Sequence, residues 1–106
     1  MSRKMINGEQ ANLLGLKKED IREIVSVLSK YGANKIYLFG SHATGEAREG
    51  SDIDLAVDGI KGEVFFKAFG EILLRISSDV DLIDLSDAKR TLQNRIEREG
   101  RVIYEK

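Results

Sequence analysis

Cysteine, proline and tryptophan are all missing from this chain of 106 residues. Without cysteine the protein can form no disulfide framework, no zinc–thiolate site and no thiol nucleophile. The single histidine, His42, excludes a metal site built from several histidines. These absences leave carboxylates as the side chains to examine for metal binding.

An excess of charge of one sign is missing as well. The chain carries 17 Lys and Arg residues against 18 Asp and Glu residues, for a net charge of −1. It has no global basic field of the kind that drives nucleic-acid binding, so we do not expect nucleic acid as the main ligand, although the composition still allows a local basic patch. No apolar run approaches the length of a membrane span, and residues 1–4 lack the apolar core of a signal peptide. We therefore expect a cytoplasmic protein with no membrane partner.

Length and composition predict one globular domain. A chain of 106 residues is large enough for one hydrophobic core but not for two, and 42% hydrophobic with 33% charged residues is typical of a globular protein with a charged surface. Residues 1–15 are polar and show little periodicity, so we predict a loosely ordered N-terminal lead-in there. Residues 16–106 are predicted to form the single domain.

Hydrophobic periodicity predicts helices that alternate with strands. Helices are predicted over 17–31, 63–76 and 87–99. Strands are predicted over 35–39, 52–57, 80–85 and 102–104. Gly32 and Gly100 are suited to end the first and last helices, and Ser86 is suited to cap the start of the last one. Arg95 and Glu99 have the spacing of a solvent-facing ion pair on that helix. The expected fold class is α/β, a small mixed sheet of three to four strands with flanking helices.

The most informative pattern joins the end of one predicted strand to the start of the next. Gly40 and Ser41 follow the strand 35–39, and after ten further residues come Asp52 and Asp54. Alternate side chains of a strand point the same way, so Asp52 and Asp54 should stand side by side. Two carboxylates held so close together repel each other, and this repulsion is costly unless a cation neutralises it. A divalent metal that carries nucleotide phosphates is the natural candidate.

Gly40 and Ser41 have the chemistry of a phosphate site. Glycine lets the backbone turn sharply and approach a ligand closely. Ser41 adds a hydroxyl and an N–H at the start of a turn or helix, where amide dipoles favour phosphate.

A third carboxylate is expected from a neighbouring strand, where Asp79, Asp81 and Asp84 are the choices. We prefer Asp81 because it lies inside the predicted strand between apolar residues, where an idle carboxylate is costly. It could ligate the metal, accept the proton of an attacking hydroxyl, or do both.

This pattern of Gly-Ser, ten residues and Asp-x-Asp resembles the nucleotidyltransferase superfamily related to DNA polymerase beta. In particular it resembles the minimal nucleotidyltransferase (MNT) domains that accompany HEPN-domain proteins in prokaryotic toxin–antitoxin pairs. The resemblance implies a polymerase beta-like nucleotidyltransferase fold in which Gly40 and Ser41 hold the nucleotide triphosphate. It implies that Asp52, Asp54 and Asp81 are catalytic and bind two Mg²⁺ ions. It also implies ATP as the substrate and transfer of AMP to a hydroxyl of a HEPN partner, with release of pyrophosphate.

Two other functions remain open. The chain could be a binding module that inhibits its partner by contact, with a vestigial metal site, or a transferase that acts on a small molecule or an RNA end. The five intact motif residues disfavour a vestigial site. The near-neutral charge disfavours RNA, and the short length disfavours a dedicated small-molecule pocket.

Residues outside the motif are expected to be mainly structural. His42 is expected to point into solvent from its loop, whereas Arg48 could be solvated or could bind a phosphate or an acidic partner surface. The phenylalanines of the second helix are expected to be core residues rather than a base-stacking platform; they are Phe65, Phe66 and Phe69. Apolar side chains off the main face of that helix are expected to form part of an interface with a partner or a second copy of the chain; they are Val64, Phe66 and Leu74.

Overall fold

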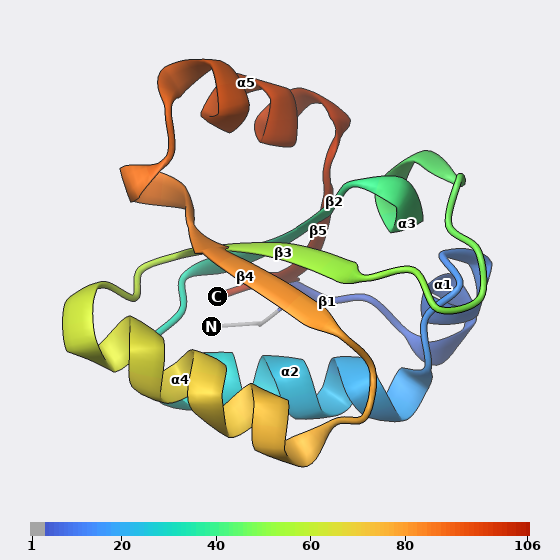
Figure 1. Ribbon diagram of the computed structural model, residues 1–106, viewed down its shortest axis with the longest axis horizontal. Coiled ribbons are helices and arrows are strands. Elements are labelled where there is room, and N and C mark those ends of the chain that lie inside the picture. Colours follow the sequence, from blue (N-terminus) through green and yellow to red (C-terminus); the bar gives the residue numbers. More distant parts are fainter. Residues whose placement is uncertain (1–3) are drawn as a thin grey trace.

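The structure is a computed structural model that describes residues 4–106, and it consists of one sheet with helices on both faces (Figure 1). The strands are β1 (Lys4–Met5), β2 (Lys35–Phe39), β3 (Ile53–Asp58), β4 (Val80–Asp84) and β5 (Arg101–Glu105). The helices are α1 (Gly8–Leu13), α2 (Lys18–Lys30), α3 (Ser41–Thr44), α4 (Gly62–Arg75) and α5 (Arg90–Glu99), with a 3₁₀ turn, η1 (Leu85–Asp87). The α/β class and the helices predicted over 17–31 and 63–76 are confirmed.

The sheet order is β1-β5-β2-β3-β4, in which only the pair β3–β4 is parallel. A parallel pair needs a crossover connection, and α4 provides it on the same side of the sheet as α2. In the register, Asp54 of β3 lies opposite Phe39 of β2 and opposite Asp81 of β4. The end of β2, which leads into Gly40, therefore lies beside the start of β3, which carries Asp54. The start of β4, which carries Asp81, lies on the other side of Asp54.

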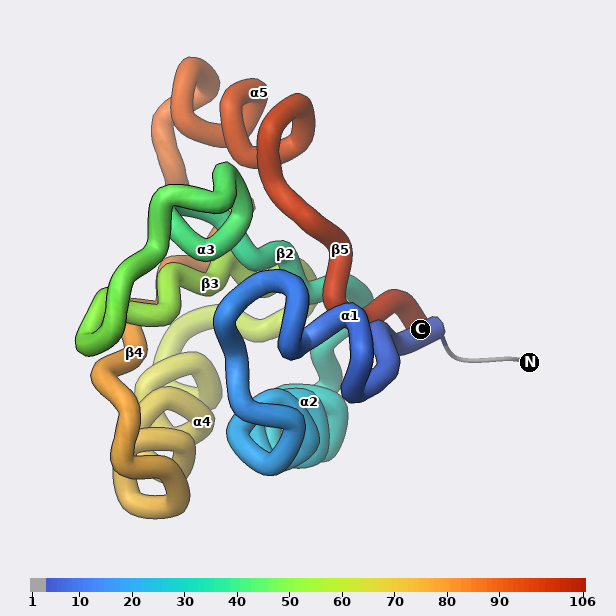
Figure 2. The backbone as a smooth tube through the Cα atoms, turned by 90° about the vertical axis from the view of Figure 1, so that its right-hand side faces the viewer, coloured from blue at the N-terminus to red at the C-terminus, as the bar shows by residue number. Residues whose placement is uncertain are grey.

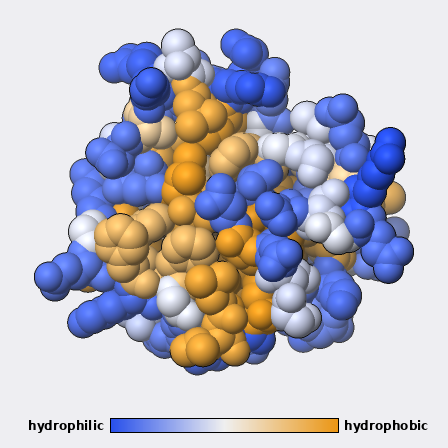
Figure 3. Space-filling model, viewed as in Figure 1, coloured by the Kyte–Doolittle hydropathy of each residue, from blue (hydrophilic) through white to orange (hydrophobic). Residues whose placement is uncertain are grey.

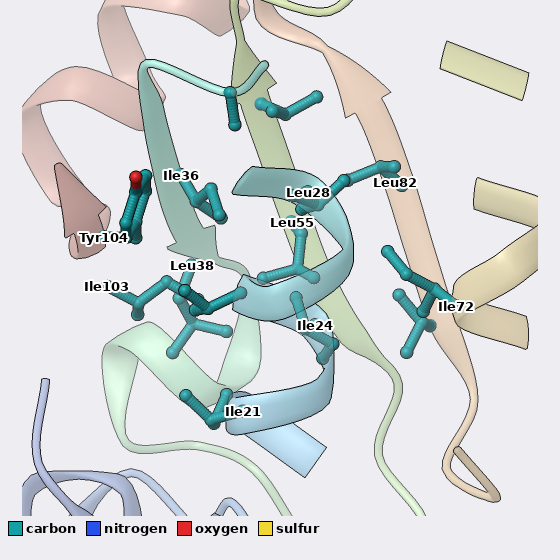
Figure 4. Packing of buried hydrophobic residues seen from close by; sticks show 14 of the residues in the cluster. Ile21, Ile24, Leu28, Ile36, Leu38, Leu55, Ile72, Leu82, Ile103 and Tyr104 are labelled. Carbon is teal, nitrogen blue, oxygen red and sulfur yellow. The ribbon is translucent and has the colours of Figure 1, made fainter. Parts of the chain in front are cut away.

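Alternation along β3 separates the core from the acidic face. Ile53, Leu55 and Val57 are buried in the main core, which lies between the sheet and the helices α2 and α4. Figure 4 shows Ile24 and Leu28 of α2 close to Leu55 in this cluster. Asp54 and Ala56 must then point to the opposite face. The hydrophobic residues of β3 thereby fix the direction of the Asp54 side chain.

A second, smaller core holds α5 over that opposite face. Ile96 of α5 is buried against Tyr37 of β2 and Ala56 of β3. Figure 2 shows α5 and α3 together on the side of the sheet away from α2 and α4. Ile96 therefore anchors a helix directly above the strands that carry the Gly-Ser and the carboxylates.

The lead-in predicted over residues 1–15 differs from the structure in its described part. Strand β1 pairs with β5, with Met5 opposite Tyr104. A reciprocal capping box between Asn7 and Gln10 begins α1. A two-residue strand and a short polar helix show no periodicity, which explains the missed elements. The prediction for residues 1–3 lies outside the described residues, and the sheet has five strands rather than three or four.

The start of the last helix also differs from the prediction. The Asp84 side chain accepts hydrogen bonds from the backbone N–H and the hydroxyl of Ser86 and caps η1, and α5 begins only at Arg90. Ser86 was expected to cap the start of a helix, but Asp84 acts as the cap because its carboxylate accepts a hydrogen bond from the N–H of Ser86, two residues later in the chain. The prediction that Gly100 follows the helix is confirmed. Within residues 4–106, every helix is too short or too polar to cross a lipid bilayer.

Candidate functional site

Gly40 connects β2 to α3 in a conformation that a side chain would oppose. Its φ of 72° lies in the left-handed region, which favours glycine. A Cβ at this position would overlap Oδ2 of Asp54. The missing side chain therefore allows the backbone of residue 40 to lie directly against the carboxylate of Asp54.

Ser41 is the first residue of α3 and is half-buried. Its carbonyl oxygen accepts hydrogen bonds from the backbone N–H groups of Glu46, at 2.9 Å, and Ala47, at 3.1 Å. These bonds close the chain back onto α3 after Gly45. The predicted phosphate residues Gly40 and Ser41 thus belong to one ordered turn.

The three predicted carboxylates influence one another on the face of the sheet below α5. Asp54 is half-buried, whereas Asp52 and Asp81 are exposed. Burial raises the pKa of Asp54, the charges of Asp81 and Asp52 raise the pKa further, and the nearby His42 lowers it. The folded chain therefore holds repulsion among these carboxylates that a cation would relieve.

Asp81 is the best placed of the three choices for the third carboxylate. It lies opposite Asp54 in the parallel pair β3–β4. Asp84 is occupied in capping η1, and Asp79 precedes β4 as an exposed residue whose carbonyl oxygen accepts a hydrogen bond from the N–H of Ile53. The register thus favours Asp81.

The donor chemistry of this cluster fits a hard divalent cation. Carboxylate oxygens are the ligands that Mg²⁺ takes together with phosphate oxygens and water. Among residues 4–106, no three acidic or histidine side chains already converge closely enough to hold a metal ion. The fit rests on the type of donors and on the raised pKa of Asp54.

A pocket of about 350 Å³ opens beside Gly40 and Ser41, between α3 and α5. Its apolar lining residues are Phe39, Ala43, Leu92 and Ile96. Its polar side chains are Thr44, Glu46, Arg95 and Glu99. None of the three carboxylates lines this pocket, but Gly40 both lines it and lies against Asp54. The pocket and the carboxylates therefore meet at Gly40.

His42 is buried, with 5% of its surface exposed, so the prediction that it points into solvent is wrong. Its Nδ1 lies 2.8 Å from the carbonyl oxygen of Leu14, and its Nε2 lies 3.4 Å from that of Ser51. The ring thereby joins α3 to the segment after α1 and to the residue before Asp52. Sequence patterns give no sign of such contacts because both partners are backbone carbonyls.

Arg48 is exposed and does not line the pocket beside Gly40 and Ser41. Its backbone N–H donates to the hydroxyl of Ser51 at 2.8 Å, which closes the loop before Asp52. Arg95 does line the pocket, and its predicted ion pair with Glu99 is confirmed at 3.2 Å. Sequence reasoning treated Arg95 only as a surface residue, because its place at this pocket depends on the packing of α5.

The helix α4 presents exposed apolar side chains. Phe65 is buried and Phe69 is half-buried against the main core, but Phe66 is 72% exposed, so its assignment to the core is wrong. Val64 and Leu74 are exposed too, as predicted. Figure 3 shows apolar surface gathered where α4 lies in Figure 1.

Comparison with known proteins decides the family. The model of the family described as polymerase beta, nucleotidyltransferase matches residues 22–106. The chain belongs to this family. The matched segment contains the Gly-Ser, all three carboxylates and the whole of α5.

The nucleotidyltransferase family includes relatives with more specific names. Protein adenylyltransferase MntA of Shewanella oneidensis is 33% identical over 72 residues, which cover 65% of this chain and 52% of that protein. The chain thus spans about half the length of this relative.

Two solved structures share the fold of this chain. A chain in the crystal structure of a toxin–antitoxin with AMP-PNP is 28% identical, with a TM-score of 0.69, and the match covers 80% of this chain and 73% of that one. A chain in the structure of a tri-AMPylated Shewanella oneidensis HEPN toxin in complex with MNT antitoxin is 25% identical. Its TM-score is 0.64, and the match covers 83% of this chain and 71% of that one.

Proposed function

We propose that this chain transfers AMP from ATP to a hydroxyl of a HEPN-domain partner protein and acts as the antitoxin of that partner. The observation that carries the proposal is the contact of the Gly40 backbone with Asp54, with Asp81 directly beside Asp54. The names of the relatives support it, because one is a protein adenylyltransferase and another structure holds an AMPylated HEPN toxin with an MNT antitoxin.

Each group has a separate task in this reaction. Asp52, Asp54 and Asp81 would hold Mg²⁺, which when bound supplies positive charge for the acceptor oxygen and for the leaving pyrophosphate. The Gly40 backbone and the Ser41 hydroxyl receive the triphosphate, since the missing Cβ lets the Gly40 backbone lie directly against Asp54, which would hold the cation.

The chemical step is an in-line displacement at the α-phosphorus of ATP. Asp81 accepts the proton of the acceptor hydroxyl as the bond from the acceptor oxygen to phosphorus forms. The bond from phosphorus to the bridging oxygen breaks at the same centre, and pyrophosphate leaves with that electron pair. The products are an AMP-modified partner and pyrophosphate.

A second candidate function is inhibition of the partner by contact alone. The exposed apolar side chains of α4, Phe66 and Leu74 among them, favour it because such surface commonly binds another protein. In that case the partner would be inhibited equally well without ATP.

The test uses α-³²P-labelled ATP, Mg²⁺ and a HEPN partner, with the products separated on a denaturing gel. We expect a labelled partner band with the wild-type chain and none with Asp54→Asn. Asp58→Asn is the matched control, because Asp58 lies on the same face of β3 at the far end from Gly40, opposite Lys35, and its variant should keep the band. Equal labelling by Asp54→Asn, or no labelling by the wild type, would contradict the proposed transfer. Inhibition of the partner by Asp54→Asn without ATP would establish the contact mechanism instead.

A further inference from the structure

Arg95 lies on α5 at the pocket that opens beside Gly40 and Ser41. We propose that its guanidinium binds the terminal phosphates of the nucleotide. The inference rests on the proposed function, which brings a triphosphate to Gly40 and Ser41. It assigns a phosphate-binding role to a residue outside the Gly-Ser and carboxylate motifs.

The position of Arg95 is fixed by its buried neighbour. Ile96 is packed against Tyr37 and Ala56, and this contact holds α5 against the sheet. At the end of α5 the backbone N–H of Gly100 donates to the carbonyl oxygen of Ile96 at 2.7 Å. A Cβ at Gly100 would crowd that oxygen and would lie 3.1 Å from the carbonyl oxygen of Leu38 on β2. The helix thus ends tightly against the strand that leads to Gly40.

A triphosphate that enters this pocket needs a positively charged side chain, because acidic residues already line it. Within residues 4–106, Arg95 is the only basic side chain that lines this pocket, where Glu46 and Glu99 contribute negative charge. A triphosphate would add several negative charges next to Asp54. A guanidinium suits this task because it stays charged and can bind two phosphate oxygens at once.

The present partner of Arg95 is easily displaced. Its Nε donates to Oε2 of Glu99 at 3.2 Å, in an ion pair one helical turn apart. The Arg95 side chain is 71% exposed, and exposed pairs of this kind stabilise a protein very little. A phosphate can therefore compete for the guanidinium, and Glu99 opposes phosphate binding both as a competitor and as a nearby negative charge.

Arg98 offers a matched control on the same helix. Its side chain is also 71% exposed, and it also contacts Glu99, at 3.8 Å, but it does not line the pocket. Replacing Arg95 or Arg98 by Gln removes one positive charge in each case. Only the loss of Arg95 should remove a phosphate ligand.

The experiment is calorimetric titration of the full chain with inorganic triphosphate, and separately with ATP and AMP, in the presence of Mg²⁺. We expect Arg95→Gln to weaken binding of triphosphate and of ATP by about tenfold or more and to leave AMP binding unchanged. Arg98→Gln should change these affinities by no more than about twofold, because a distant exposed charge is screened by salt. Glu99→Gln should tighten triphosphate binding.

The proposal is overturned if Arg95→Gln binds triphosphate as well as the wild type does, or if Arg95→Gln and Arg98→Gln weaken it equally. It is also overturned if the wild type binds no triphosphate. Because the measurement is binding of inorganic triphosphate, it is independent of AMP transfer. A chain that binds triphosphate through Arg95 but labels no partner would support this assignment and refute the proposed transfer.

Discussion

Nδ1 of His42 lies 2.8 Å from the carbonyl oxygen of Leu14, so the helix that follows Gly40 is joined to the segment after α1. The imidazole is buried, and its Nε2 faces the carbonyl oxygen of Ser51 at 3.4 Å. The His42 side chain therefore joins α3, which follows Gly40, both to Leu14 and to Ser51, the residue before Asp52.

Replacing His42 should loosen this support. We expect His42→Leu to lower the free energy of unfolding by about 1–3 kcal/mol, because the carbonyl oxygen of Leu14 loses its polar partner. Urea unfolding followed by circular dichroism measures the loss. Asn7→Ala is a suitable control, since it removes the capping box of α1, at a cost of about 1 kcal/mol, without touching the His42 ring. Mg²⁺-ATP binding should weaken in His42→Leu but not in Asn7→Ala. Equal ATP affinity in the two variants would show that His42 does not support the site.

Gly40→Ala should be more damaging than Gly45→Ala. Both glycines have positive φ, at 72° and 83°, but Gly40 has a ψ of −153°, a combination that essentially only glycine adopts, whereas Gly45 has a ψ of 8° in the αL region, where alanine costs about 1 kcal/mol. At Gly40 the new Cβ would also overlap Asp54, whereas at Gly45 it would meet no atom within 4 Å. Thermal unfolding and ATP titration of both variants measure the combined effect of the overlap and of the glycine-only backbone conformation at Gly40. Equal losses at the two positions would refute the argument that the close approach to Asp54 requires glycine.

The raised pKa of Asp54 predicts how stability depends on pH and on Mg²⁺. Since its pKa in the folded chain lies above the unfolded value, protonated Asp54 stabilises the fold, and this contribution is lost as pH rises through the folded pKa. At neutral pH Asp54→Asn should therefore unfold at a higher temperature than the wild type in EDTA. Mg²⁺ should raise the unfolding temperature of the wild type but not that of Asp54→Asn.

The stabilisation by Mg²⁺ should also decline as the pH falls through the raised pKa of Asp54, because protons and the cation compete for one carboxylate. Calorimetric scans with Mg²⁺ and with EDTA over a series of pH values measure this difference. Asp58→Asn serves as the control and should behave as the wild type does. Stabilisation of Asp54→Asn and of the wild type by the same amount would place the cation elsewhere.

The apolar surface of α4 is predicted to bind the HEPN partner. Leu74 is 89% exposed, so Leu74→Ser should leave the unfolding temperature unchanged while it weakens the complex. Lys67→Ser, an exposed polar position on the same helix, is the control and should bind as the wild type does. Size-exclusion chromatography with light scattering measures both the complex and any self-association. A strict monomer whose nucleotide affinity no partner changes would contradict the interface.

Local sequence patterns predicted the parts of the site that depend on neighbouring residues in the chain. The alternation of apolar residues with Asp54 along β3 predicted the side of the sheet to which the Asp54 side chain points. The apolar residues that precede Gly40 predicted where β2 ends. The contact of Arg95 with the pocket could not be predicted in this way, because it depends on how Ile96 packs against a distant strand. The strand β1 was missed for a similar reason, since its two residues are held only by pairing with β5 at the other end of the chain.

The position of β4 at the end of the sheet order has a consequence for acceptor choice. Asp81 lies on this outermost strand, so no further strand of the described chain covers its outer side. A hydroxyl on the surface of a large folded molecule would then reach Asp81 without entering a cleft. Under the proposed function, the hydroxyl that is modified would be selected by the orientation of the docked partner.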